Sequence, residues 1–136
     1  MTEGLFLTVN SLYELDYPHS VALSQTLDKG NPLYTYVCYF KAEQELDTAR
    51  KDHFFTTASQ NTSQEHQALC SIIQGRRMLE QKSVHADELQ QWSERAMSRV
   101  PAPLHPYVSF LAGMVCLNNE RIPQAAHWFQ KSALHF

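Results

Sequence analysis

The chain has 136 residues, of which 43% are hydrophobic and 18% are charged. A chain of this length can bury roughly two-thirds of the surface that its unfolded form exposes, which is enough for one compact domain. The formal net charge is −3, and neither sign of charge forms a long run. This composition excludes a strongly basic surface, so we expect no nucleic-acid partner.

The N-terminal segment MTEGLFLTVN has no basic region, and its apolar run is only a few residues long. It resembles neither a signal peptide nor a membrane span, so we expect a cytoplasmic protein with no membrane span. The three cysteines, Cys38, Cys70 and Cys116, are widely spaced and form no Cys-x-x-Cys pair. We interpret them as small apolar core residues rather than as a disulfide framework or a zinc ribbon.

Helix-forming residues dominate the long segments, and only four glycines occur. The sequence therefore predicts an all-α fold. Helix starts are marked by Pro18, Pro32, Pro106 and Pro123, because proline at the first helical position sacrifices no hydrogen bond. A further start is marked by the capping pattern Thr62-Ser63-Gln64-Glu65. We predict eight helices, over residues 3–15, 18–28, 32–45, 47–59, 63–80, 86–98, 106–117 and 123–136.

The third predicted helix contains the run YTYVCYF at residues 34–40, which by propensity alone suits a strand. The segment KAEQE follows without a turn and favours a helix, so we predict a helix for the whole stretch. Residues 100–106 contain three prolines and are expected to form a stiff connector without a helix. In the fifth and sixth helices, the side chains expected to point inward are Leu69, Ile72, Ile73, Met78, Leu89, Trp92 and Ala96.

Eight helices of similar length form four hairpins, which suggests an internal repeat. The turns inside the hairpins supply an alignment. Tyr17 and Ile122 each precede a proline at the start of a second helix, and Leu46 is predicted to open the second helix of the second hairpin in the same way. Ile122 lies 76 positions after Leu46, which is about two units of a 34- to 40-residue helical repeat.

The fourth hairpin resembles a tetratricopeptide repeat. That motif has a small residue midway along its first helix, and an alanine, an aromatic residue and a small residue at fixed spacing in its second. These places are taken by Gly113, Ala125, Phe129 and Ser132, whereas Ser109 and Cys116 stand where the family usually has tryptophan and tyrosine. The other hairpins match at fewer positions, namely Leu7, Tyr17, Ser20, Ser24 and Leu27 in the first, Leu46 and Ala49 in the second, and Gly75 and Ala96 in the third.

The resemblance implies four antiparallel helix hairpins stacked as a short solenoid, in a single domain over residues 1–136, with a concave face able to hold a peptide or helix of another protein. In length and mild acidity the chain is similar to the helical-repeat chaperones of bacterial type III secretion systems, which hold a translocator or needle subunit until export. The function implied is that of a non-enzymatic chaperone. The alternative is a scaffold subunit of a larger multiprotein assembly.

Eight residues are candidates for contact with a partner on such a surface: Tyr13, Tyr36, Tyr39, Phe40, Arg76, Arg77, Tyr107 and Trp128. Aromatic rings that keep one edge in water are typical of binding hot spots. The two arginines, with Arg95 and Arg99, could pair with carboxylates of a partner. The alternative for each is a structural role, as a ring in the core or as an arginine on a solvated face.

The C-terminal residues Ala133-Leu134-His135-Phe136 supply no polar capping helix, although a solenoid needs one at each end. Three interpretations stay open for the rings of Trp128, Phe129 and Phe136. They fold under the preceding helices, or they form an open end that binds another copy or another subunit, or the natural protein is longer.

We expect no enzyme, cofactor or metal site. His66 and Cys70 have the i, i+4 spacing of two zinc ligands, but no second pair with matching spacing exists. Phosphate-binding glycine loops, nucleophile elbows and His-Glu-x-x-His motifs are missing from the sequence. A small helical enzyme that uses His66 and Cys70 is retained only as a third class of function.

Overall fold

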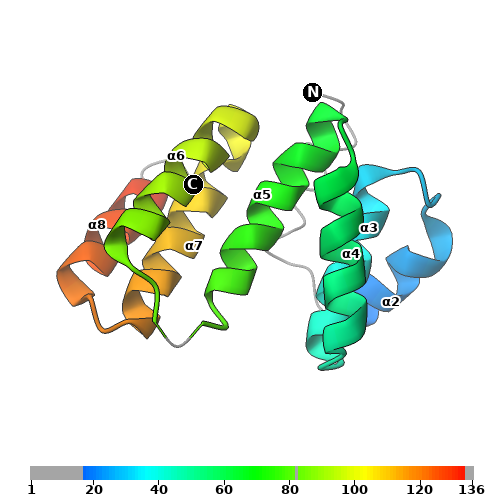
Figure 1. Cartoon of the computed structure of the whole chain (residues 1–136), viewed down its shortest axis with the longest axis horizontal. Helices are drawn as coiled ribbons and strands as arrows, with labels where there is room; N and C mark the ends of the chain where they lie inside the picture. The colour runs from blue at the N-terminus through cyan, green and yellow to red at the C-terminus, as the bar shows by residue number, and fades with distance from the viewer. Residues whose placement is uncertain (1–16, 82, 134–136) are drawn as a thin grey trace. The chain divides into compact units, whose positions relative to one another are not determined.

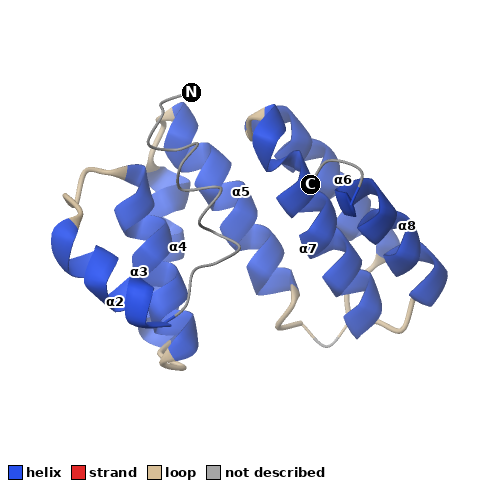
Figure 2. Cartoon of the chain, turned by 180° about the vertical axis from the view of Figure 1, so that it is seen from behind, coloured by secondary structure: helices blue, strands red, loops and turns tan. Residues whose placement is uncertain are grey.

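The structure, a computed structural model, describes residues 17–81 and 83–133. Within these ranges every regular element is helical and no strand occurs, which confirms the all-α prediction (Figures 1 and 2). The predicted helix over residues 3–15, which includes Tyr13, lies outside the described residues, as does Phe136. The helices are α2 (Tyr17–Thr26), α3 (Pro32–Gln44), α4 (Thr48–Gln60), α5 (Gln64–Met78), α6 (Ala86–Arg99), the 3-10 helix η1 (Ala102–Leu104), α7 (His105–Asn118) and α8 (Ile122–Ala133).

The tyrosine-rich run at residues 34–40 is helical, as predicted, and forms the middle of α3. Pro32 lies in the first turn, and the Asn31 side chain accepts a hydrogen bond of 3.0 Å from the Leu33 N–H. This bond satisfies one of the donors that a helix start leaves without an intrahelical partner. The cap and the helix-forming residues that follow the run outweigh its strand propensity.

Contacts along the chain group it into two compact units, Met1–Ile73 and Gln74–Phe136, and the boundary lies within α5. In the first unit, α3 packs against both α2 and α4. In the second unit, α7 packs against α6 and, most extensively, against α8. Each unit therefore contains at least one helix hairpin with a tight turn (Figure 1).

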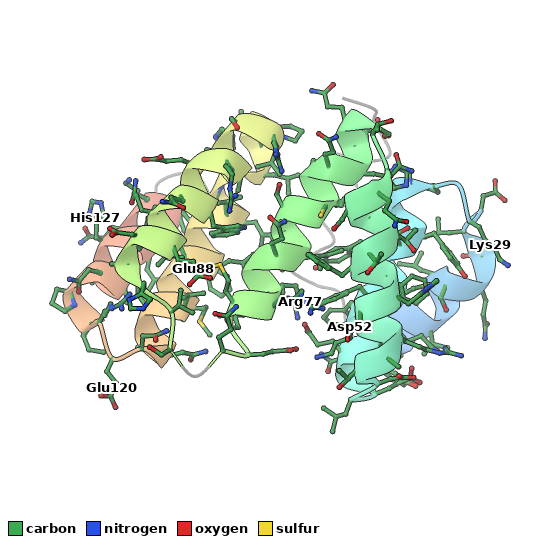
Figure 3. The ribbon with its side chains drawn as sticks, viewed as in Figure 1. Lys29, Asp52, Arg77, Glu88, Glu120 and His127 are labelled. Atoms are coloured by element: carbon green, nitrogen blue, oxygen red, sulfur yellow. The ribbon has the colours of Figure 1, made fainter. Side chains whose placement is uncertain are left out.

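The α3–α4 and α7–α8 hairpins close with the same turn. Leu46 and Glu120 adopt positive φ angles of 56° and 60°. The N–H of the next residue, Asp47 or Arg121, then donates back to a carbonyl in the last helical turn, at 2.9 Å in both hairpins. This is the Schellman arrangement that ends many helices, here without the usual glycine. The Glu120 side chain projects away from the helices at the tip of its turn (Figure 3).

These turns change the alignment expected between the two hairpins. Because Leu46 lies in the turn itself, it corresponds to Glu120 and not to Ile122. The offset between the hairpins is therefore 74 positions instead of 76. The second helices, which begin at Thr48 and Ile122, have the same offset.

The same offset aligns the buried positions of α4 and α8. Lys51 corresponds to Ala125, Ala58 corresponds to Ser132, and all four residues are buried. The sequence alignment placed Ala49 at the first of these positions, but Ala49 is exposed. The prediction for Ala49 was wrong because the turn is longer by two residues than the proline-based alignment assumed.

Close approach of helices in the second unit depends on two glycines. A Cβ atom at Gly75 of α5 would lie 2.4 Å from the Trp92 ring on α6. A Cβ atom at Gly113 of α7 would be equally obstructed by Phe129 on α8. At the far end of the α7–α8 pair, the Ser132 hydroxyl donates to the Pro106 carbonyl at 2.9 Å.

Two local predictions differ from the structure. The N-cap of α5 is Ser63, whose hydroxyl accepts from the His66 N–H at 3.4 Å, so the capping pattern begins one residue later than expected. The proline-rich connector contains the helical turn η1, closed by a 2.8 Å bond from the Leu104 N–H to the Pro101 carbonyl. The seven side chains predicted to point inward from the fifth and sixth helices are all buried.

Candidate partner-binding site

The aromatic candidates on α3 are buried. Tyr36, Tyr39 and Phe40 are 1%, 0% and 8% exposed. The interpretation that these rings keep an edge in water for a partner is therefore corrected. A run of consecutive large residues covers every side of a helix, and here even the two tyrosines are enclosed.

Two other candidates, Arg76 and Tyr107, contact each other. Arg76 in the last turn of α5 donates a hydrogen bond of 3.0 Å from Nη1 to the hydroxyl of Tyr107 on α7. Tyr107 is only 3% exposed, and both Arg76 and Arg77 are half-buried. Arg95 and Arg99 are exposed on α6. Arg76 therefore has a structural contact within the second unit, whichever further role it has.

A cavity of about 290 Å³ lies among α6, α7 and α8, entirely within the second unit. Its walls combine small and large apolar groups, two amides and one cation. The residues that line it are Ala86, Leu89, Gln90, Cys116, Arg121, Gln124 and Trp128. No carboxylate is among them, so the only formal charge in the lining is the positive charge of Arg121.

Arg121 is positioned by the turn that precedes α8. Its N–H bonds to the Cys116 carbonyl at 2.9 Å, and its own carbonyl accepts from the Ala125 N–H at 2.9 Å. These two bonds fix the backbone from which the side chain enters the cavity. The Nη1 atom of the guanidinium is buried and has no hydrogen-bond partner among the described residues. A charged donor in this condition costs free energy until an acceptor is supplied.

The thiol of Cys116, which also lines the cavity, is removed from water. Burial raises the pKa of Cys116 above its ordinary value of 9.0, although the positive charge of Arg121 acts in the opposite direction. Desolvation is the larger effect. The thiol therefore stays protonated and uncharged at neutral pH, and the cavity does not contain a reactive thiolate.

Trp128 is the one sequence-predicted candidate that lines the cavity. Its indole is half-buried, and the ammonium of Lys131 lies 4.8 Å from the ring centroid. The ring of His127, which projects from α8 in Figure 3, lies 6.3 Å from it. An aromatic wall with the Lys131 ammonium beside it favours an apolar group that carries negative charge.

A second cavity, of about 120 Å³, lies in the first unit and is lined in part by Tyr34, Lys41 and Glu45. Its charges are already paired. Lys41 and Glu45 form an ion pair of 3.3 Å, and Glu45 also accepts from the Tyr17 hydroxyl at 2.8 Å. The hydrogen bond from Tyr17 is the main reason that the pKa of Glu45 is lowered and the pKa of Tyr17 is raised. Arg50, which also lines this cavity, pairs with Asp47 at 3.6 Å. The smaller cavity thus offers a ligand no charge that lacks a partner.

The pair considered for zinc makes hydrogen bonds to serines. The Cys70 thiol lies 3.4 Å from the Ser59 hydroxyl, and His66 Nδ1 lies 3.2 Å from the Ser63 hydroxyl. Burial lowers the pKa of His66, and the nearby Glu65 only partly offsets this effect. In the part of the chain that the structure describes, no group of three or more His, Cys, Asp and Glu residues could hold a metal ion.

Arg121, Gln124 and Leu89 line the cavity but are not among the residues predicted to contact a partner. A signal for two of them was present, because Arg121, Gln124 and Trp128 follow the i, i+3, i+7 spacing of one helix face. Leu89 was expected to point inward, and it is buried at the cavity wall. Leu89 lines the same cavity as residues of α8 because of the way α6 packs in the second unit. The spacing of residues along the sequence does not reveal this packing.

No protein-family model, curated protein or solved structure matches this chain. None of the described helices has both the length and the apolar character needed to cross a membrane.

Proposed function

We propose that the chain is a non-enzymatic adaptor that binds a segment of another protein. The observation that supports this most directly is the α6–α7–α8 cavity, which both Arg121 and Trp128 line. Its 290 Å³ lies just below the usual range for sites that enclose a cofactor or a drug-sized ligand. A volume of this size suits one or two side chains of a protein partner.

The resemblance to tetratricopeptide repeats gives this proposal a more specific form. Two hairpins with the same turn and with equivalent buried positions, 74 residues apart, support a repeated architecture of about 37 residues per unit. On this basis we propose a cytoplasmic chaperone that holds a subunit of a secretion system through a helical-repeat groove. Such a chaperone is soluble alone and releases its client.

A scaffold subunit of a larger assembly is the second candidate. Phe110 and Leu117 are 38% and 43% exposed, and their spacing of seven positions puts them on one face of α7. Ile122, at the start of α8, is also exposed. Large apolar residues in such a group favour a stable contact with another chain. These residues differ from Trp128, Phe129 and Phe136, which the sequence analysis considered for an open end near the C-terminus.

Affinity purification of the tagged full chain from its native host, followed by mass spectrometry, tests the adaptor proposal. We expect the wild-type chain to retain a defined partner and the Trp128→Ala variant to lose it. Lys29→Gln, at an exposed position in the first unit, is the control and should retain the partner. Recovery of the chain without any partner under gentle conditions, including chemical cross-linking, would contradict the proposal.

The purified chain also distinguishes a chaperone from a scaffold subunit. A chaperone is expected to sediment as a monomer once its client has been removed, and to release that client in exchange for a competing segment. A scaffold subunit is expected to dimerise or precipitate alone and to become monomeric when Phe110 and Leu117 are replaced by serine.

A further inference from the structure

The cavity contains the positive charge of Arg121, whose Nη1 donor is buried and has no hydrogen-bond partner among the described residues. A guanidinium binds a carboxylate well, because its N–H groups match the two carboxylate oxygens in spacing and charge. The cavity therefore favours a ligand that contains an anionic group. Its other walls are mostly apolar.

The apolar walls define the rest of the ligand. Leu89, Ala86 and the Trp128 ring line the same cavity as Arg121. Contact with an aliphatic or aromatic group removes these surfaces from water, which is favourable. A free inorganic anion would leave them in contact with water and would use only one part of the site.

The charges around the cavity also favour an acidic ligand. Lys131 adds a second cation next to Trp128. Gln124 lies in the first turn of α8, where the helix dipole is positive. A cationic ligand would be repelled by Arg121 and Lys131, so we expect the ligand to carry a negative charge.

We propose that the α6–α7–α8 cavity binds a bulky apolar side chain of a partner protein together with an adjacent carboxylate, which forms an ion pair with Arg121. The proposal rests on the adaptor function proposed above and adds the chemistry of the recognised segment. The partner segment has an acidic residue next to a phenylalanine, leucine or similar side chain. A glutamine in place of Arg121 removes the preference for the acid without removing the apolar walls.

Short peptides provide the test, with the full chain labelled by ¹⁵N and observed by NMR. The probe is N-acetyl-Gly-Phe-Asp-Gly-amide, and the matched peptides carry Asn in place of Asp or Ala in place of Phe. We expect the Phe-Asp peptide to shift the Trp128 indole signal, which the Trp128→Phe variant assigns, with a dissociation constant on the order of a millimolar. Each matched peptide should bind about tenfold more weakly, since each lacks one of the two interactions.

Variants connect the result to the cavity. Arg121→Gln should bind the Asp and Asn peptides equally, and Trp128→Leu should weaken both. Lys29→Gln, which removes a positive charge from an exposed position in the first unit, should bind as the wild type does. A dispersed ¹⁵N spectrum of each variant shows that the fold is retained. Equal preference for the Asp peptide in wild type and Arg121→Gln would overturn the proposal, as would signal changes confined to residues outside α6, α7 and α8.

Free 3-phenylpropionate distinguishes a protein segment from a small acid. If this compound binds at least as tightly as the Phe-Asp peptide, the cavity is a site for small acids, and the protein-segment proposal is overturned. The adaptor function is judged separately by co-purification. If Arg121→Gln and Trp128→Ala both retain the wild-type partner, the cavity assignment fails but the adaptor function stands; if the wild type retains no partner, the adaptor function fails.

Discussion

The Phe129 ring on α8 lies directly over Gly113 on α7, with its Cε1 atom 2.6 Å from the place where a Cβ atom would be. Hydrogen is therefore the only side chain that fits without a shift of the ring. We expect Gly113→Ala to lower the free energy of unfolding by about 1–3 kcal/mol through overpacking, and Gly113→Leu to lower it further. Urea unfolding followed by circular dichroism measures the change.

Gly30 is the control for this substitution. A Cβ atom there meets no other atom within 4 Å, so Gly30→Ala should leave the stability unchanged or raise it by about 0.4–1 kcal/mol. The double variant Gly113→Ala/Phe129→Leu should recover part of the loss, because the smaller side chain gives room to the new methyl group. Equal effects of alanine at Gly30 and Gly113 would contradict the close packing of α7 and α8.

At the two turns with positive φ, glycine substitutions are expected to raise the stability. Leu46 is 86% exposed, so its side chain stabilises little by packing, while its left-handed backbone is strained. We expect Leu46→Gly and Glu120→Gly each to raise the free energy of unfolding by about 0.5–1 kcal/mol. Thermal unfolding of the single variants and of the double variant measures this gain.

Gln44→Gly is the matched control for these turns. Gln44 is exposed as well, but it ends α3 with right-handed helical geometry, and glycine there should cost up to about 1 kcal/mol. A loss of stability at all three positions would mean that the turn conformation is not the one described.

The buried tyrosines of α3 are expected to act on stability. Tyr39→Ala and Tyr36→Ala should each cost about 3–5 kcal/mol, as for other large aromatic side chains removed from an enclosed place. Tyr17→Ala, at a side chain that is partly exposed on α2, should cost less than about 1 kcal/mol. Urea unfolding measures these changes, as shifts of the denaturation midpoint between variants with the same m-value. Unchanged midpoints for Tyr36→Ala and Tyr39→Ala would return these residues to the list of exposed binding candidates.

His66 makes stability depend on pH. Because burial lowers its pKa below the ordinary value of 6.5, the unfolded chain takes up this proton more readily than the folded chain. The contribution of His66 is therefore fully present above pH 6.5 and is lost as the pH falls through the lower pKa of the folded state. Urea unfolding at pH 7.5 and pH 5.5 should show a loss for the wild type that is smaller in His66→Gln. Identical losses in the two proteins would assign the pH dependence to other groups.

The sequence predicted the helices well because their signals are local. Pro32 with Asn31 marks the start of α3, and the stripe of Leu89, Trp92 and Ala96 identifies the buried face of α6. The turns were harder to predict. Leu46 and Glu120 adopt a conformation that usually indicates glycine, and the hydrogen bonds that hold them there join residues on both sides of the turn.

The site was predicted less well than the fold for a physical reason. The chemistry of aromatic rings makes them candidates for binding. Whether a ring is exposed depends on how the helices pack, and this packing buries Tyr36 and Tyr39. Trp128 is a predicted candidate and lines the cavity, whereas the only sequence signal for Arg121 is its spacing on one helix face with Gln124 and Trp128, which is not a recognisable motif. Its importance comes from a cavity to which three helices contribute.

The three buried thiols act as built-in reporters for the separate opening of the two units. Cys38 and Cys70 lie in the first unit and Cys116 in the second, and none is exposed in the native chain. We therefore expect an alkylating reagent to react slowly with each thiol in the native chain and much faster once the surrounding helices separate. Mass spectrometry of the modified peptides over time would reveal which unit opens first, without the introduction of a label.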